Sequence, residues 1–164
     1  MRSLHQAGCR GHLGVFLQNF LTDRTFQTRI QSTLSDTFSL VEGIPQGSVL
    51  SCSLFAIAIN DIVKDLPVGV QNALYVDDFA IYFTTASLLT AQRRLQLAIN
   101  KIFSWANSVG YRLSPEKTKS ILFYRDKRWL GNGNSSLELN MGTSVIECCS
   151  SVRYLGMIFD SHLN

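Results

Sequence analysis

Two apolar segments of strand length, residues 73–76 and 79–83, are separated only by the adjacent acidic residues Asp77 and Asp78. Burial of an unpaired carboxylate costs several kcal/mol, and a second like charge beside it adds repulsion. The segments therefore predict two strands joined at an acidic tip. One interpretation of the tip is an ordinary solvated turn, because Asp is common in turns. The other is a site for a divalent cation such as Mg²⁺, which binds hard oxygen ligands. The acidic pair alone favours the ordinary turn.

The rest of the chain alternates helical patterns with short strand patterns. Between residues 87 and 109 apolar side chains recur at steps of three and four, which predicts an amphipathic helix that Gly110 ends. Paired strands interrupted by helices predict the α+β class with a largely antiparallel sheet. Helices are expected at residues 4–21, 49–62 and 87–109, strands at 26–30, 38–40, 73–76, 79–83, 120–124, 137–141, 145–148 and 152–159, and a loop at 131–136.

Composition narrows the class of protein further. The 164 residues are 46% hydrophobic, which is enough for one domain with a real core. No run of about 18 apolar residues is present, so we expect neither a transmembrane helix nor a membrane partner. The N-terminal residues lack the apolar run of a signal peptide, and we expect an intracellular protein. The net charge of +3 permits nucleic-acid binding without demanding it. The four cysteines form no CxxC pair, so free thiols are expected rather than a zinc site.

A glycine- and proline-containing segment, Gly43-Ile44-Pro45-Gln46-Gly47-Ser48, precedes the second predicted helix. Glycine allows a backbone to pass close to a ligand, and Ser48 is a good N-cap residue. The N–H groups at the start of a helix suit phosphate. Taken alone, this segment favours an ordinary helix-capping loop.

Together these segments resemble ordered motifs of reverse transcriptases. The 43–48 segment resembles motif B, and Tyr75-Val76-Asp77-Asp78 in its apolar setting resembles motif C. Residues 110–118 resemble motif D, and residues 154–160 resemble the Leu-Gly-containing motif E region. The amino-acid sequence at residues 47–51, 54–56, 59–62 and 95–100 is similar to that of jockey-type non-LTR retrotransposons. The resemblance covers nearly the whole chain, and four motifs in order make it specific.

The resemblance implies an RNA-directed DNA polymerase, a nucleotidyltransferase, and assigns roles to the residues at its motifs. Asp77 and Asp78 would be catalytic carboxylates that bind metal, and Lys117 would be a proton donor to the leaving pyrophosphate. A solvent-facing lysine is nearly as good an explanation of Lys117. Contacts to template, nucleotide or primer end would come from Pro45, Gln46, Gly47, Ser48, Tyr75 and Val76, and a primer grip from Leu155 and Gly156.

The same resemblance implies the cofactor and the partners. Two-metal phosphoryl transfer uses ions about 3.5–4 Å apart, which need carboxylates from more than one strand. The expected cofactor is Mg²⁺ in a two-ion site. The expected partners are an RNA template, a DNA primer and deoxynucleoside triphosphates. A nuclear location is implied by the family alone.

Motif A, which supplies the other aspartate of such a site, has no counterpart in this sequence. No aspartate occurs before Phe16, and Asp23 and Asp36 lie in turn-like segments. We therefore expect a partial polymerase palm over residues 1–164, from just after motif A to motif E, with no fingers, thumb or endonuclease. Its expected centre is an antiparallel sheet with a Tyr-x-Asp-Asp hairpin packed on two or more helices. Alone, such a fragment should hold Mg²⁺ weakly and should be inactive.

Three other interpretations remain open. The first is a non-catalytic nucleic-acid-binding remnant of a decayed mobile element, whose phosphate contacts would come from Lys101, Lys117, Lys119, Arg125, Lys127 and Arg128. The second is an inert product, or a reading frame that begins at an internal methionine. The third, an unrelated Mg²⁺-dependent enzyme, would require four ordered motifs to arise by accident.

Overall fold

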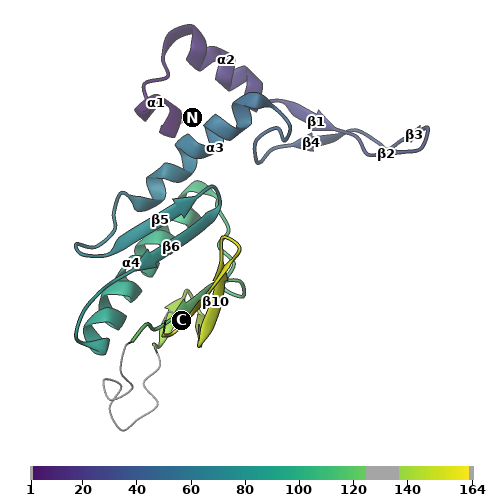
Figure 1. Cartoon of the computed structure of the whole chain (residues 1–164). Helices are drawn as coiled ribbons and strands as arrows, with labels where there is room; N and C mark the ends of the chain where they lie inside the picture. The colour runs from purple at the N-terminus through teal and green to yellow at the C-terminus, as the bar shows by residue number, and fades with distance from the viewer. Residues whose placement is uncertain (1, 125–136, 163–164) are drawn as a thin grey trace. The chain divides into compact units, whose positions relative to one another are not determined.

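The computed structural model describes residues 2–124 and 137–162 (Figure 1). The chain divides into two compact units, Met1–Asp61 and Ile62–Asn164, and each is described by itself. The first contains α1 (Arg2–Gln6), α2 (Gly11–Leu21), β1 (Arg24–Phe26), β2 (Arg29–Ile30), β3 (Thr33–Leu34), β4 (Phe38–Leu40) and α3 (Val49–Ile59). After the short 3₁₀ helix η1 (Asn60–Val63), the second contains β5 (Gln71–Tyr75), β6 (Asp78–Tyr82), α4 (Leu88–Val109), β7 (Lys119–Ile121), β8 (Leu139–Met141), β9 (Ser144–Cys149), β10 (Ser151–Tyr154) and β11 (Met157–Asp160).

The first predicted helix, residues 4–21, is wrong as a single element, because the chain turns between α1 and α2. Gly8 takes a positive φ of 86° and donates its N–H to the His5 carbonyl at 3.2 Å. Cys9 donates to the Leu4 carbonyl at 3.0 Å, which closes the turn. A glycine adopts this left-handed conformation at little cost, so α1 ends there.

The strands expected at residues 26–30 and 38–40 are both present, but the first is interrupted, because β1 ends at Phe26 and β2 covers Arg29–Ile30. Strands β1 and β4 are antiparallel, with Phe26 opposite Phe38 and their ring centroids 5.7 Å apart. Strands β2 and β3, which lie between β1 and β4 in the sequence, form a second antiparallel pair. Figure 1 shows this arm as a narrow ribbon leading away from α2 and α3. Its side chains are largely exposed.

The core of the first unit is small. Leu4 from α1, Leu17 from α2 and Leu54 from α3 are buried together, and Ile44 from the 43–48 loop lies partly buried against them. Helix α3 confirms the prediction for residues 49–62, although it ends at Ile59 and continues as η1. The loop before α3 is therefore held to the body of its unit.

Helix α4 confirms the long helix predicted at residues 87–109. The Ser87 hydroxyl accepts the Thr90 N–H at 3.3 Å, and Gly110 ends the helix in the left-handed conformation. The buried face consists of Ala91, Ala98, Ile99, Ile102 and Ala106. These positions repeat at helical spacing, so one apolar stripe faces the core of the second unit.

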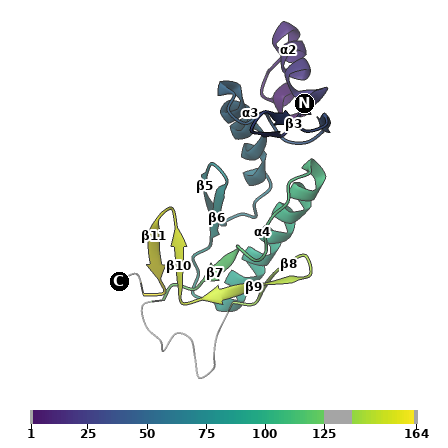
Figure 2. The same cartoon turned by 90° about the vertical axis from the view of Figure 1, so that its right-hand side faces the viewer.

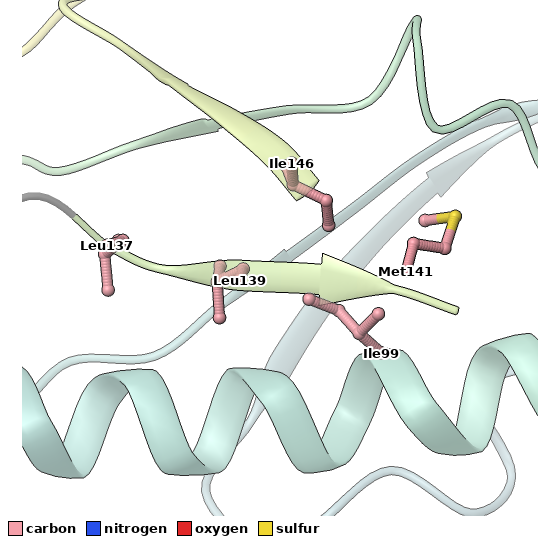
Figure 3. Close-up of a cluster of buried hydrophobic side chains, with 5 residues drawn as sticks. All are labelled: Ile99, Leu137, Leu139, Met141 and Ile146. Atoms are coloured by element: carbon pink, nitrogen blue, oxygen red, sulfur yellow. The ribbon is translucent and has the colours of Figure 1, made fainter. Parts of the chain in front are cut away.

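That core lies between α4 and a three-stranded sheet in the order β7-β9-β8. Figure 3 shows Ile99 projecting from α4 toward the strands, where Leu137, Leu139, Met141 and Ile146 complete the buried cluster. Strands β8 and β9 are antiparallel, but β7 and β9 are parallel. A parallel pair cannot be joined by a tight turn, and residues 122–143 separate these two strands in the sequence.

The mixed α and β composition with small, mostly antiparallel sheets agrees with the α+β class. Within the described residues the strands form five separate sheets rather than one, and β7–β9 is the exception to antiparallel pairing. No helix within residues 2–124 and 137–162 has the length and apolar character needed to cross a bilayer. The loop expected at residues 131–136 lies outside the described residues.

The outer edge of β8 is covered by a side chain of α4. Gln96 donates its Nε2 to the Asn140 carbonyl, and its Oε1 accepts the Asn140 N–H, both at 2.8 Å. The amide thus takes the place that a further strand would occupy. Figure 2 shows α4 running alongside β8.

Candidate active site

The acidic tip, residues 75–78, joins β5 to β6. The two strands are antiparallel, with Tyr75 directly opposite Asp78, so that Val76 and Asp77 form a two-residue turn. Val76 takes a positive φ of 55°. All four side chains are exposed. The local pattern explains this arrangement, because the apolar strands on either side can bury side chains while the carboxylates remain in water.

The two faces of the β5–β6 hairpin differ in burial. Leu74, Phe79 and Ile81 share the half-buried face, and Ile81 packs against the core cluster below α4. Tyr75 and Asp78 lie on the opposite face, because directly paired residues of an antiparallel ladder point to the same side. An aromatic ring and a carboxylate are therefore presented together on an open surface.

Asp77 and Asp78 form no ion pair with any other described residue. Two exposed carboxylates are suitable ligands for Mg²⁺, which usually binds one or two carboxylates together with substrate phosphates. Within residues 2–124 and 137–162, no group of three or more His, Cys, Asp or Glu side chains could hold a metal ion. The tip therefore fits one side of a metal site, and the described residues supply no further side-chain ligand.

The 43–48 loop of the first unit is anchored over its first half. Arg24 donates to the carbonyls of Glu42 at 3.3 Å and Gly43 at 2.7 Å. Ile44 packs against the small core, and the buried Ser51 hydroxyl donates to the Pro45 carbonyl. Two side-chain hydrogen-bond donors, Arg24 and Ser51, and the apolar contact of Ile44 thus fix the backbone before Gln46.

The second half of the loop is open to solvent. Gln46 and Gly47 are exposed, and a Cβ placed on Gly47 would meet no atom within 4 Å. Ser48 occupies the predicted N-cap position of α3, but its hydroxyl makes no capping hydrogen bond. The first turn of α3 therefore begins with polar groups available beside an exposed amide side chain. The predicted convergence of this loop and the acidic tip on one nucleotide stays a prediction.

The remaining predicted site residues lie in turns of the second unit. Lys117 is exposed in the turn that precedes β7. Leu155 and Gly156 form the turn between β10 and β11, with positive φ values of 49° and 84°, and Leu155 is 46% exposed. Their roles as proton donor and primer grip stay predictions.

Of the basic residues of the alternative interpretation, Lys101, Lys117 and Lys119 lie within the described chain. Lys101 is exposed on α4, whereas Lys119 on β7 forms an ion pair with Glu147 on β9. Arg125, Lys127 and Arg128 lie outside the described residues. The lysine of the ion pair is already engaged with a carboxylate, which makes it a weaker phosphate contact.

Two residues that organise the 43–48 loop were missed by the sequence analysis. Arg24 falls between the predicted helix at residues 4–21 and the predicted strand at 26–30, and its partners are backbone carbonyls, which carry no sequence signature. Ser51 is a lone hydroxyl within an apolar helical run. A buried serine near a helix start often bonds a neighbouring backbone carbonyl, and this was the available signal.

Comparison with known families confirms the resemblance to reverse transcriptases. The family model described as reverse transcriptase (RNA-dependent DNA polymerase) matches residues 1–159. The chain is 27% identical over 157 residues to an RNA-directed DNA polymerase from the mobile element jockey of Drosophila melanogaster, covering 92% of this chain. It is also 27% identical over 154 residues, 90% of this chain, to a probable RNA-directed DNA polymerase from transposon BS of the same organism.

In both relatives the matched region is 16% of the protein. The chain thus corresponds to a small part of these polymerases, and the shared region includes the acidic tip and the 43–48 loop. With the family model matching 159 of its 164 residues, the chain belongs to the reverse transcriptase (RNA-dependent DNA polymerase) family.

Proposed function

We propose that this chain is the palm segment of a jockey-type RNA-directed DNA polymerase, from just after motif A to motif E. The reaction is attack of a primer 3′-hydroxyl oxygen on the α-phosphorus of a deoxynucleoside triphosphate. The α-phosphorus–oxygen bond to the leaving pyrophosphate breaks as the new bond forms, and the hydroxyl proton is released to water. The observation that carries the proposal is the exposed pair Asp77-Asp78 at a hairpin turn, inside a region that matches the family.

Each motif takes one part of this reaction. Asp77 and Asp78 would hold Mg²⁺, and the bound cation would offset the charge of the phosphates. Tyr75 and Val76 lie beside the primer end, and residues 45–48 contact the template and the nucleotide. Lys117 gives a proton to pyrophosphate, and Leu155 and Gly156 steady the primer strand. The partners are therefore an RNA template, a DNA primer and deoxynucleoside triphosphates.

A metal titration tests the role of the acidic tip. Mn²⁺, a paramagnetic substitute for Mg²⁺, should broaden the amide NMR signals of residues 75–79 in the wild-type chain. The broadening should be lost in Asp77→Asn and Asp78→Asn, because an amide is a much poorer ligand for a hard cation than a carboxylate. Asp65→Asn, a change at an exposed aspartate of the same unit, is the matched control. Equal broadening in all variants would remove the basis of the proposed metal site.

Primer extension tests the expected inactivity of the 164-residue polypeptide. With only one side of a metal site among its described residues, the purified chain should incorporate no nucleotide above background on an RNA template. Incorporation that disappears in Asp77→Asn would contradict the expected inactivity while supporting the polymerase assignment. Salt-dependent binding to a primer–template that survives both aspartate changes, without metal binding at the tip, would instead favour the non-catalytic remnant.

A further inference from the structure

We infer that Arg24 is a positioning residue for the 43–48 loop, setting its shape so that Gln46 and Gly47 can meet nucleic acid. Arg24 itself would make no contact with the nucleic acid. This inference rests on the proposed function of the loop as a template and nucleotide contact. It adds a residue outside all four sequence motifs to the binding machinery.

The hydrogen bonds of Arg24 connect two elements that are far apart in sequence. Its Nε donates to the carbonyl of Leu21, the last residue of α2, at 3.1 Å. Its Nη2 donates to the carbonyls of Glu42 and Gly43 at 3.3 and 2.7 Å. One planar guanidinium therefore ties the end of a helix to the backbone where the loop begins.

The chemistry of each partner suits this arrangement. The last carbonyls of a helix have no partner inside the helix and carry the negative end of its dipole, so a cation there is favourable. Hydrogen bonds from a charged donor are stronger than neutral ones. The three acceptors are all main-chain carbonyls, so the guanidinium is directed at the protein backbone rather than presented to an outside anion.

Besides Arg24, two further contacts hold the 43–48 loop, and they leave only its apex, Gln46 and Gly47, exposed. Ser51 bonds the Pro45 carbonyl and Ile44 packs against the core, whereas Gln46 and Gly47 are exposed. Without Arg24 the carbonyls of Glu42 and Gly43 lose their charged donor. The apex would then pivot about Pro45 instead of being held from both sides.

One donor of the guanidinium remains unused. Nη1 is buried and has no hydrogen-bond partner among the described residues. A lysine could not reproduce this geometry, because its ammonium is a single point of charge rather than a rigid fork. Arg24→Lys should therefore keep the charge and lose most of the positioning.

The first experiment measures binding of the 164-residue chain to a fluorescent RNA–DNA primer–template by anisotropy. Arg24→Gln should raise Kd by about tenfold, the loss expected when charge-assisted hydrogen bonds are removed. Arg29→Gln is the matched control, because Arg29 is exposed on the same hairpin arm and bonds only the Gln31 carbonyl nearby. Equal effects of the two changes would show that charge alone matters and would overturn the inference.

A double-mutant cycle with Gln46→Ala separates positioning from direct contact. If Arg24 acts through the loop apex, Arg24→Gln should cost little further affinity once Gln46 is truncated. The dependence of Kd on salt should also be unchanged by Arg24→Gln, since no phosphate contact is lost. Additive losses, or a salt dependence reduced by about one ion, would identify Arg24 as a phosphate contact and reject the positioning role.

Hydrogen exchange keeps the inference testable apart from the proposed function. In the absence of nucleic acid, the loop amides of residues 43, 44 and 46–48 should exchange faster in Arg24→Gln than in wild type or Arg29→Gln, while those of α3 remain protected. Unchanged exchange in the loop would overturn the inference whatever the binding result. If wild type fails to bind primer–template but the loop loses protection in Arg24→Gln, the proposed function fails and the structural role of Arg24 stands.

Discussion

Val76 has an unusual backbone conformation for a β-branched residue. Its φ of 55° lies in the left-handed region, which costs an L-residue about 1–2 kcal/mol. Its side chain is 60% exposed, so burial does not repay that cost. Strain of this kind persists where the surrounding structure requires it, and it gathers at functional sites. The turn that presents Asp77 and Asp78 is therefore built on a residue that stability alone would not select.

Replacement of Val76 by asparagine should relieve this strain. Asparagine tolerates the left-handed conformation, so Val76→Asn should raise the free energy of unfolding of the second unit by about 1 kcal/mol. Val68→Asn is the matched control, because Val68 is also exposed, lies in a turn of the same unit and does not have a positive φ. That change should stay within about 0.5 kcal/mol. Chemical denaturation monitored by circular dichroism measures both, and equal shifts would show that Val76 is not strained.

At the scale of residues, the sequence revealed groups whose chemistry conflicts with their surroundings. Asp77 and Asp78 stand out because two charges interrupt apolar strands. The structure places both in an exposed turn, where the carboxylates stay in water. Arg24 could not be found in this way. Its importance comes from three backbone carbonyls that the fold brings to it, and those carbonyls are identical for every residue type.

The parallel pair of β7 and β9 carries an exposed ion pair across its ladder. Lys119 lies opposite Glu147 and donates to its carboxylate. This hydrogen bond is the main cause that lowers the pKa of Glu147 and raises the pKa of Lys119. A carboxyl group whose pKa is lowered by folding stabilises the folded state at pH values above its unfolded-state pKa. That stabilisation is lost as the pH falls through the folded-state pKa.

The contribution of this pair should therefore depend on pH. Glu147→Gln should lower Tm slightly at pH 7, and the difference from wild type should disappear as the pH falls below the ordinary carboxyl pKa of 4.5 and then through the lowered pKa. The effect should be small and weakened by salt because both side chains are exposed. Glu138→Gln removes the same charge from the same unit and serves as control. A Tm difference that persisted at low pH would mean that packing rather than the ion pair is responsible.

Among the elements, those with local signals were predicted well. Helix α4 has a regular apolar stripe, a Ser87 cap and a Gly110 end, and all three lie within its own segment. The break between α1 and α2 was missed because the apolar spacing of residues 13–20 was taken to extend back to residue 4, across Gly8. The parallel pairing of β7 with β9 was also missed, since it depends on a crossover between distant segments rather than on either strand.

The two units of the molecule have unequal cores. In the described chain, the buried apolar side chains of the first unit are Leu4, Leu17 and Leu54. The second unit has a more extensive set between α4 and its sheet, including Ala98 and Ile99. Because hydrophobic burial is the dominant stabilising term, the first unit should open at a lower free energy than the second.

Hydrogen exchange of the whole chain tests this expectation. Amides of α3 should exchange faster than those of α4. Leu54→Ala should destabilise by about 2–5 kcal/mol, as buried leucine truncations do, and should leave the slowest amides of α4 unchanged. Ile99→Ala should accelerate the α4 amides directly. If Leu54→Ala accelerated both sets equally, the two units would unfold as one cooperative body.

For the whole molecule, the sequence was sufficient to identify the family, because four motifs occur in order and each is short and local. It was sufficient for the α+β class as well. It could not yield the division into two units or the separate small sheets, which depend on contacts between distant segments. The meeting of the 43–48 loop with the acidic tip depends on such contacts too and stays a prediction.

The amide of Gln96 has a consequence for how this protein meets other copies of itself. A bare strand edge invites another strand to add on, which is the first step toward fibrous association. Along β8 the N–H and carbonyl of Asn140, which could pair with an added strand, already form hydrogen bonds with Gln96. Any intruding strand would first have to displace a side chain rooted in a 22-residue helix. The side chain of Gln96 thus opposes strand addition by a second copy of the chain at the outer edge of β8.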